Sequence, residues 1–204
     1  MRKLRLFDFL PSGNGYKIRL LLIQLGIPFE RIELNITKGE TRTPEFLNKN
    51  HFGKIPLLEI DENKYLSESN AILIYLSENT EFLPEDPFLR AQVLQWLFFE
   101  QNQHEPNIAT SRYWISILGR PPQYQEILNQ KQELGYMALN IMEEHLIKHN
   151  FFVDERYTIA DIALFAYTHV ADEGGFDLTR FPAIQAWIER VKNQPNYISI
   201  TQNI

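Results

Sequence analysis

The spacing of hydrophobic residues changes several times over the first part of the chain. Alternating apolar positions predict a strand over Lys3–Phe9, and apolar residues at helical spacing predict a helix over Tyr16–Leu25, which Gly26 ends. A second alternating segment, Phe29–Ile36, predicts another strand. Strand, helix and strand at this spacing indicate a βαβ unit.

A short helix, a hairpin and a longer helix are expected next. Pro44 is suited to the first position of a helix, and a polar turn between the apolar runs at residues 57–60 and 65–66 is typical of a β-hairpin. Ser69 then begins an amphipathic helix. The resulting order, β-α-β-α-β-β-α, matches a thioredoxin-like domain over residues 1–81.

The remaining sequence is helical in pattern. Residues 82–87 hold two prolines and two acidic residues without periodicity, so we expect a linker there. Beyond it we find no strand pattern of any length. Residues 88–204 therefore predict an all-helical domain, with helices over residues 88–118 (bent at Pro106), 123–149, 158–171 and 181–191.

Two of these helices have distinctive patterns. The helix over residues 158–171 is apolar on nearly every side, as buried helices are, and Thr158 with Asp161 forms a capping box at its start. The helix over residues 123–149 has its apolar residues at Ile127, Leu134, Met137, Ala138, Ile141 and Leu146.

Composition excludes several kinds of function. The chain has 204 residues and a net charge of −6, which does not suit nucleic-acid binding. It has no cysteine, which excludes disulfides, thiolate metal sites and a cysteine nucleophile. No apolar run reaches the ~18 residues of a membrane span, and Asp8 interrupts the N-terminal apolar run that a secretion signal needs. We therefore expect a cytoplasmic protein without nucleic-acid or membrane partners.

Histidines do not predict a metal site. His145 and His149 are four residues apart on one helix face, which is a spacing that can bind a metal ion. No third ligand accompanies them, and positive charge near a helix C-terminus is favourable without any metal. We expect no metal.

Two neighbouring stretches have candidate binding chemistry. Pro56 cannot donate a backbone hydrogen bond, so a strand can begin there, and a cis Ile55–Pro56 bond would turn the Ile55 amide and carbonyl toward an incoming peptide. Ser69 at a helix start places N–H groups and a hydroxyl where a carboxylate can bind. Each feature alone is common, but together they predict a small peptide-binding site.

The loop after the first strand contains Ser12 and Asn14, at the start of the first helix. A serine hydroxyl or an asparagine amide there can cap the helix, or it can donate a hydrogen bond to a thiolate. Spacing alone favours the cap.

In this order, the features resemble the glutathione transferase family. The residues that carry the resemblance are Gly53–Leu57, Leu66–Ile72 and the run Pro11-Ser12-Gly13-Asn14-Gly15-Tyr16-Lys17-Ile18, which is similar to bacterial members with a Ser/Thr-x-Asn loop. The resemblance covers nearly the whole chain. It implies a two-domain α+β/α protein, with a thioredoxin-like N-terminal domain followed by an all-α C-terminal domain.

The resemblance also implies roles for individual residues. Ser12, with Asn14, would stabilise the thiolate of glutathione. The resemblance does not settle which of the two side chains contacts the sulfur. The γ-glutamyl group would bind Glu68 and Ser69, while the cysteine part would pair with Ile55, next to Pro56. Arg42 and Lys54 would lie near the glycine carboxylate. Thr41 stands where relatives often have His or Gln, which departs from the family pattern.

The function implied is that of a homodimeric glutathione transferase in detoxification. Glutathione would be the co-substrate, without a metal, and its thiolate would attack a small electrophile. Two alternatives stay open: a glutathione-dependent disulfide reductase of the same fold, and a non-catalytic binding or stress-regulation protein. The full set of site residues favours an enzyme.

Overall fold

The computed structural model describes residues 4–204, so Lys3, the predicted start of the first strand, lies outside the described residues. The chain divides into two compact units. One, here the N-terminal unit, contains the chain up to Glu78 together with Pro195–Ile204; the other, the helical unit, is Asn79–Gln194. The domain limits expected from the sequence (1–81, 82–87 and 88–204) stay a prediction.

A four-stranded mixed sheet forms the centre of the N-terminal unit. Its strands are β1 (Leu4–Asp8), β2 (Phe29–Glu33), β3 (Leu57–Asp61) and β4 (Lys64–Ser67), in the order β2-β1-β3-β4. β1 is parallel to β2 and antiparallel to β3, which is antiparallel to β4. Leu57 is opposite Phe7 on β1 and Ser67 on β4. The segments after β1, before β3 and after β4 therefore lie at the same end of the sheet.

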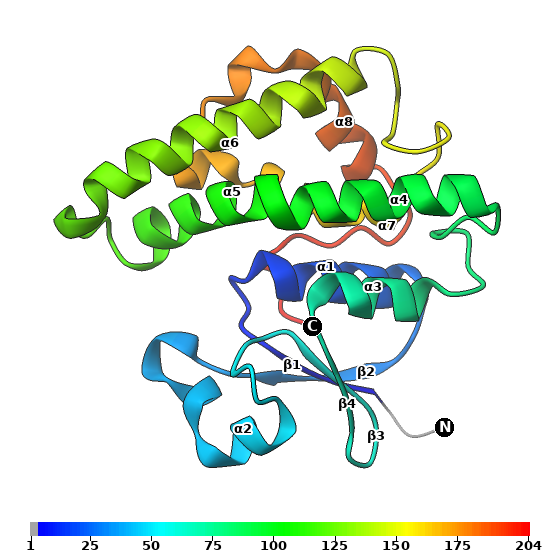
Figure 1. Cartoon of the computed structure of the whole chain (residues 1–204). Helices are drawn as coiled ribbons and strands as arrows, with labels where there is room; N and C mark the ends of the chain where they lie inside the picture. Colours follow the sequence, from blue (N-terminus) through cyan, green and yellow to red (C-terminus); the bar gives the residue numbers. More distant parts are fainter. Residues whose placement is uncertain (1–3) are drawn as a thin grey trace. The chain divides into compact units, whose positions relative to one another are not determined.

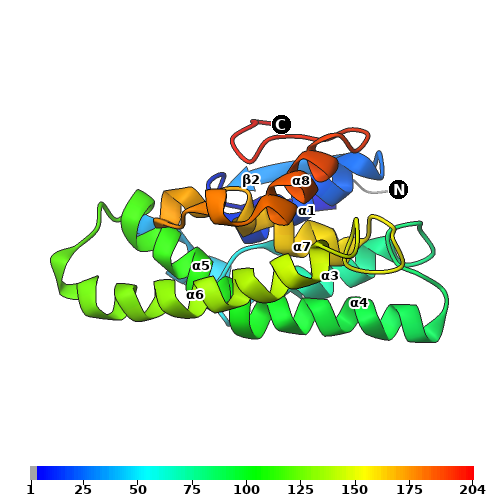
Figure 2. The same cartoon turned by 90° about the horizontal axis from the view of Figure 1, so that it is seen from above.

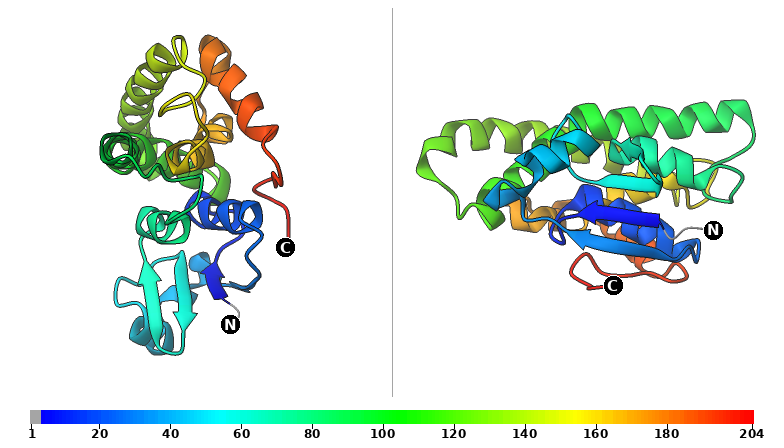
Figure 3. Two further views of the ribbon diagram at one scale, coloured as in Figure 1. Left: turned by 90° about the vertical axis from the view of Figure 1, so that its right-hand side faces the viewer. Right: turned by 90° about the horizontal axis from the view of Figure 1, so that it is seen from below.

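Helices cover both faces of this sheet. α1 (Gly13–Gln24) and α3 (Ser69–Ser77) lie side by side over one face (Figures 1 and 3). α2 (Pro44–Lys49) covers the other face through Phe46, which packs against Phe7 and Leu57. This arrangement confirms the predicted thioredoxin-like fold.

The second strand is shorter than predicted. β2 ends at Glu33, and Asn35 instead caps a 3-10 turn at Ile36–Lys38, where its side chain accepts hydrogen bonds from the amides of Thr37 and Lys38. A second 3-10 turn, Glu40–Arg42, leads to α2. Local side-chain hydrogen bonding at Asn35 therefore outweighs the strand pattern that reaches Ile36.

The helical unit contains α4 (Pro87–Phe99), α5 (Glu105–Arg112), α6 (Gln125–Leu146), α7 (Ile159–Thr168) and α8 (Pro182–Lys192). The predicted helix over residues 88–118 is interrupted by π-helical turns at Glu100–His104 and Tyr113–Ile117. The first of these turns directly precedes Pro106 in the first turn of α5. A proline clashes with the carbonyl four residues earlier, which explains a departure from regular α-helix at this point. None of the helices within residues 4–204 is long and apolar enough to cross a membrane.

α7 lies at the centre of the helical unit (Figure 2). All ten of its residues are buried. The predicted capping box is confirmed: the Thr158 side chain accepts from the Ala160 amide, and Asp161 Oδ2 accepts from the Thr158 amide at 2.9 Å. Asp161 Oδ1 also accepts from Trp187 Nε1 at 3.0 Å. Burial raises the pKa of Asp161 to about 6, although these hydrogen bonds favour its charged form.

α6 has two apolar faces. Of the apolar residues that mark this helix in the sequence, Ala138 and Leu146 are buried. The other four, Ile127, Leu134, Met137 and Ile141, are exposed, with Met137 the most exposed at 61%. The face that packs into the unit is formed by Leu128, Gly135, Ala138, Leu139, Met142 and Leu146.

Candidate functional site

The predicted site residues come from three segments that meet at one end of the N-terminal sheet. Ser12 ends the loop after β1, Ile55 directly precedes Pro56 and β3, and Ser69 follows β4 after the single residue Glu68. Sheet register explains the convergence, because Leu57 is paired with residues of both neighbouring strands near this end.

Ser12 is the N-cap of α1. Its Oγ accepts a hydrogen bond from the Gly15 amide at 3.3 Å, and its carbonyl accepts from the Tyr16 amide at 2.9 Å. Because Oγ acts as the acceptor in this cap, its own proton can be given to another acceptor. Ser12 can therefore cap the helix and also donate toward a bound anion.

A buried ion pair lies beside the loop between β1 and α1. Arg19 Nε lies 2.9 Å from Asp8 Oδ2, and both side chains are fully buried. Arg19 also donates to the carbonyl oxygens of Leu10, at 2.7 Å, and Ile200, at 3.0 Å. A Cβ on Gly15 would lie 1.6 Å from Asp8 Oδ1, so this close approach requires glycine. The pair thus joins the loop before Ser12, α1 and the C-terminal segment.

Burial changes the titration of this pair. It raises the pKa of Asp8 to about 6, with the attraction of Arg19 acting in the opposite direction, and it lowers the pKa of Arg19.

Ser69, the first residue of α3, is joined to the first loop by hydrogen bonds. Its Oγ donates to Asn14 Oδ1 at 3.2 Å, which brings two predicted site residues into contact. Lys17 Nζ donates to Ser69 Oγ at 3.2 Å and to Asn70 Oδ1 at 3.4 Å. Lys17 is fully buried, and Ser69 is 4% exposed.

Glu68 precedes α3 in an unusual backbone conformation. Its φ is 68° and its ψ is 113°, in a region that non-glycine residues seldom occupy. Such a conformation costs on the order of 1–3 kcal/mol and is often found at binding sites. The Glu68 side chain is exposed, so its carboxylate is accessible beside Ser69.

The peptide bond between Ile55 and Pro56 is cis. Pro56 is buried and Ile55 is half-buried. Asn50 orders the segment before them, because its Nδ2 donates to the Lys54 carbonyl at 2.8 Å and its Oδ1 accepts from the Phe52 amide at 3.2 Å. The backbone of residues 52–55 is thereby fixed by a buried side chain.

Arg42 contacts the turn that directly precedes Lys54. Arg42 Nη1 donates to the Phe52 carbonyl at 3.3 Å, and both cationic residues are exposed. Gly53 has a φ of 62°, and a Cβ there would lie 2.5 Å from Arg42 Nη1, so glycine lets the guanidinium cross the turn. Thr41 is buried and contributes no accessible group.

Three supporting residues were not predicted as part of the site: Lys17, Arg19 and Asn50. The sequence indicates a special role for the first two, because they are charged residues inside the otherwise apolar run of α1. A charged side chain is seldom buried there unless a specific partner compensates its charge. Asn50 had no comparable signal, since asparagine before a turn is common.

The two histidines considered for a metal have other partners. His149 Nδ1 lies 2.6 Å from Glu155 Oε1, and His145 Nε2 donates to the Phe151 carbonyl at 3.2 Å. Across residues 4–204, no group of three or more His, Cys, Asp or Glu side chains is placed to hold a metal ion.

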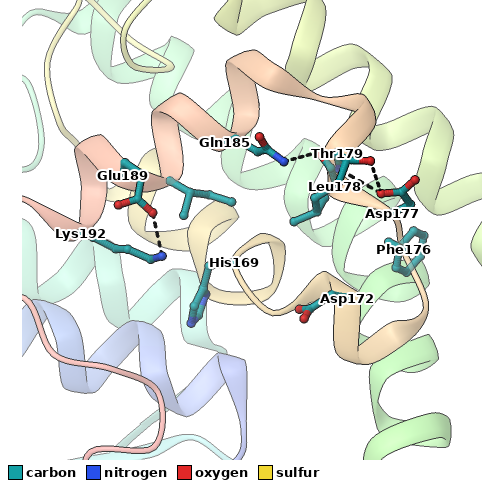
Figure 4. A pocket seen from close by; sticks show the side chains of 10 residues that line it. His169, Asp172, Phe176, Asp177, Leu178, Thr179, Gln185, Glu189 and Lys192 are labelled. Atoms are coloured by element: carbon teal, nitrogen blue, oxygen red, sulfur yellow. Dashed lines mark hydrogen bonds and ion pairs between the residues drawn. The ribbon is translucent and has the colours of Figure 1, made fainter.

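The helical unit contains a pocket of about 520 Å³ (Figure 4). Its polar groups bond to one another: Lys192 pairs with Glu189 at 2.8 Å, and Gln185 Nε2 donates to the Leu178 carbonyl at 3.0 Å. Burial lowers the pKa of His169 to about 4, so it is neutral near pH 7. The lining gives no indication of a ligand class; it consists of His169, Asp172, Phe176, Asp177, Leu178, Thr179, Gln185, Ile188, Glu189 and Lys192.

Two family models match the chain. One, described as the N-terminal domain of glutathione S-transferase, matches residues 2–78, and another, described as the C-terminal domain, matches residues 107–195. A crystal structure of a glutathione S-transferase from Pseudomonas fluorescens has a TM-score of 0.97 and 48% sequence identity, and the match covers 98% of this chain and 100% of that chain.

More distant relatives have different names. The disulfide-bond oxidoreductase YfcG of Escherichia coli is 29% identical over 194 residues, covering 92% of this chain and 89% of its own length. Protein URE2 of Candida maltosa is 28% identical over 233 residues, covering 95% of this chain and 71% of its own length.

Proposed function

Because this chain belongs to the glutathione S-transferase family, we propose that it binds glutathione at this end of the N-terminal sheet and transfers it to a small electrophile. The observation that supports this best is the hydrogen bond between Ser69 and Asn14. It joins the helix start expected to bind the γ-glutamyl group to the loop expected to meet the thiol.

Each part of glutathione has a complementary group here. The Glu68 carboxylate suits the γ-glutamyl ammonium, and the amides and hydroxyl at the start of α3 suit its α-carboxylate. The Ile55 backbone would pair with the cysteinyl residue. Arg42 and Lys54 would attract the glycine carboxylate, in a position that Asn50 and Gly53 help to fix.

The thiol requires activation. A free thiol has a pKa of about 8.5, so little thiolate is present at neutral pH. The Ser12 hydroxyl and the Asn14 amide can donate hydrogen bonds to a sulfur at the N-terminus of α1, which favours the thiolate. The thiol proton leaves to solvent, a carbon–sulfur bond forms, and the leaving group departs with its bonding electron pair.

Reduction of disulfides is a second candidate, because a relative of 29% identity is named a disulfide-bond oxidoreductase. The same thiolate would attack one sulfur of a disulfide and release the other as a thiolate, which takes up a proton. A second glutathione would then attack the mixed disulfide. The products are oxidised glutathione and two thiols, so glutathione supplies both electrons.

We further propose that the protein is a cytoplasmic homodimer with a role in detoxification. The exposed face of α6 supports self-association, because Ile127, Leu134 and Ile141 recur every two turns and Met137 lies among them. A second copy would bury this face. Met137→Glu should then shift the protein to a monomer in sedimentation velocity, whereas an unchanged dimer would exclude this face as the interface.

The experiment that tests the proposed function compares two assays on the purified protein. In one, glutathione reacts with 1-chloro-2,4-dinitrobenzene; in the other, it reduces hydroxyethyl disulfide. Conjugation that Ser12→Ala slows supports the transferase, and reduction without conjugation supports the second candidate. If Ser12→Ala and Asn14→Ala both keep full activity in both assays, the proposed thiol site is contradicted. No activity in either assay would favour the non-catalytic alternative.

A further inference from the structure

Lys17 connects the two halves of the proposed site from inside the protein. It lies on α1, its side chain is fully buried, and its Nζ contacts two residues at the start of α3, Ser69 and Asn70. Burying an ammonium group is unfavourable unless its surroundings compensate it, so this placement calls for an explanation.

The donor and acceptor chemistry gives these hydrogen bonds a direction. An ammonium group can only donate, so Ser69 Oγ accepts from Lys17. The one proton of the Ser69 hydroxyl is then given to Asn14 Oδ1. With Oδ1 used as the acceptor, the Nδ2 amide is the donor end of the Asn14 side chain.

Resting on the proposed function, we propose that Lys17 is a positioning residue that sets the donor direction of Ser69 and, through it, the orientation of the Asn14 amide toward the glutathione thiol. The hydrogen bonds from Lys17 to Ser69 and from Ser69 to Asn14 couple the part of the site that would bind the γ-glutamyl group to the part that would bind the thiol. A charged donor also strengthens the hydroxyl to which it is bonded.

The effect of Lys17 therefore extends to the sulfur. Without its ammonium group, the Ser69 hydroxyl can rotate, and the Asn14 amide can turn its oxygen toward the site. A carbonyl oxygen repels a thiolate, so the pKa of the bound thiol would rise. A residue with only a packing role would change stability but would not change this pKa.

The test uses the ultraviolet absorbance of the thiolate to titrate glutathione bound to the full-length protein. Lys17→Met keeps the length of the side chain and removes the charge, and Lys17→Arg keeps the charge. The matched control is Lys64→Met, which changes net charge equally at an exposed position on β4. Affinity for glutathione is measured in parallel by calorimetry.

Lys17→Met should weaken glutathione binding about tenfold and move the pKa of the bound thiol toward the free value of about 8.5. Lys17→Arg should restore much of the difference, and Lys64→Met should match the unmodified protein. If Lys17→Met binds glutathione and lowers the thiol pKa as the unmodified protein does, the inference is wrong while the proposed function stands. If the unmodified protein binds no glutathione, both are wrong.

A second variant tests the inference if Lys17→Met does not fold. Ser69→Ala leaves Lys17 in place and removes the group that transmits its effect. It should weaken binding and also raise the pKa of the bound thiol, because Asn14 loses its partner. Weaker binding with an unchanged thiol pKa would overturn the connection from Ser69 to Asn14.

Discussion

Ser69 Oγ donates a hydrogen bond of 3.2 Å to Asn14 Oδ1, although the two residues are 55 positions apart in the sequence. The bond places the first turn of α3 against the first turn of α1. Two helix N-termini with their amide groups thus converge at one end of the sheet, which is a favourable location for the anionic groups of a peptide.

Ser69→Ala and Ser12→Ala should have different kinetic effects. In the proposed site Ser69 would bind the γ-glutamyl carboxylate. Its removal should therefore raise the KM for glutathione about tenfold, which corresponds to the loss of one hydrogen bond to a charged group. In the proposed site Ser12 would contact the thiol, so its removal should mainly lower kcat. Steady-state kinetics over a range of glutathione concentrations separates the two, and equal effects of both variants on KM and kcat would contradict these roles.

Arg42 and Lys54 should contribute to affinity through the glycine carboxylate. Both are exposed, so each charge is screened by solvent and should contribute roughly 1 kcal/mol or less. Arg42→Ala and Lys54→Ala should each weaken glutathione binding about threefold to fivefold, and added salt should weaken it in the unmodified protein. Lys64→Ala is the control, and an equal loss there would indicate a general effect of charge.

Asp161 should affect stability without affecting the site chemistry. It accepts hydrogen bonds from Thr158 and Trp187 in the core of the helical unit. Asp161→Ala removes the cap and leaves buried donors unsatisfied, so the free energy of unfolding should fall by at least about 2 kcal/mol. Urea unfolding measures this, with Asp154→Ala, an exposed residue, as the control. A loss below about 0.5 kcal/mol would show that the capping box is not important for stability.

His169 should make the protein less stable in acid. Its pKa is about 4 in the folded chain, against 6.5 ordinarily, because burial and the positive charges of Arg112 and Lys192 disfavour the imidazolium. The unfolded chain binds the proton more tightly. The stabilisation is therefore complete above pH 6.5 and is lost as the pH falls toward 4, and for this half-buried ring it amounts to about 2 kcal/mol.

His169→Gln removes this titration. Urea unfolding between pH 7 and pH 4 should show a smaller decline in the variant than in the unmodified protein. Parallel declines would mean that His169 does not govern the acid sensitivity. The comparison isolates His169 because Asp8 and Asp161, which also titrate in this range, are present in both proteins.

Local patterns were sufficient to predict most of the fold. Alternation and helical spacing placed β1 and α1, and the Thr158–Asp161 box marked the start of α7, because each pattern reflects interactions over a few residues. The π-helical turns at Glu100–His104 and Tyr113–Ile117 were not predicted, because a proline predicts a departure from regular α-helix at Pro106 but not the form that the departure takes.

The candidate site was predictable in part. Ser12, Ile55 and Ser69 could be named because their local backbone settings are recognisable in the sequence. Lys17 and Asn50 act across the fold, on residues of other segments, so their partners appear only once the strands are paired. The exposed face of α6 was not distinguishable from its buried face, because both are apolar and the sequence does not say which one meets α5 and α8.

The most direct measurement is a calorimetric titration of the unmodified protein and of Ser69→Ala with reduced glutathione. We predict saturable binding at one site per chain, with the affinity of Ser69→Ala about tenfold lower. The absence of heat with both reduced and oxidised glutathione, or equal affinities of the two proteins, would contradict the proposal that this end of the sheet is a glutathione site.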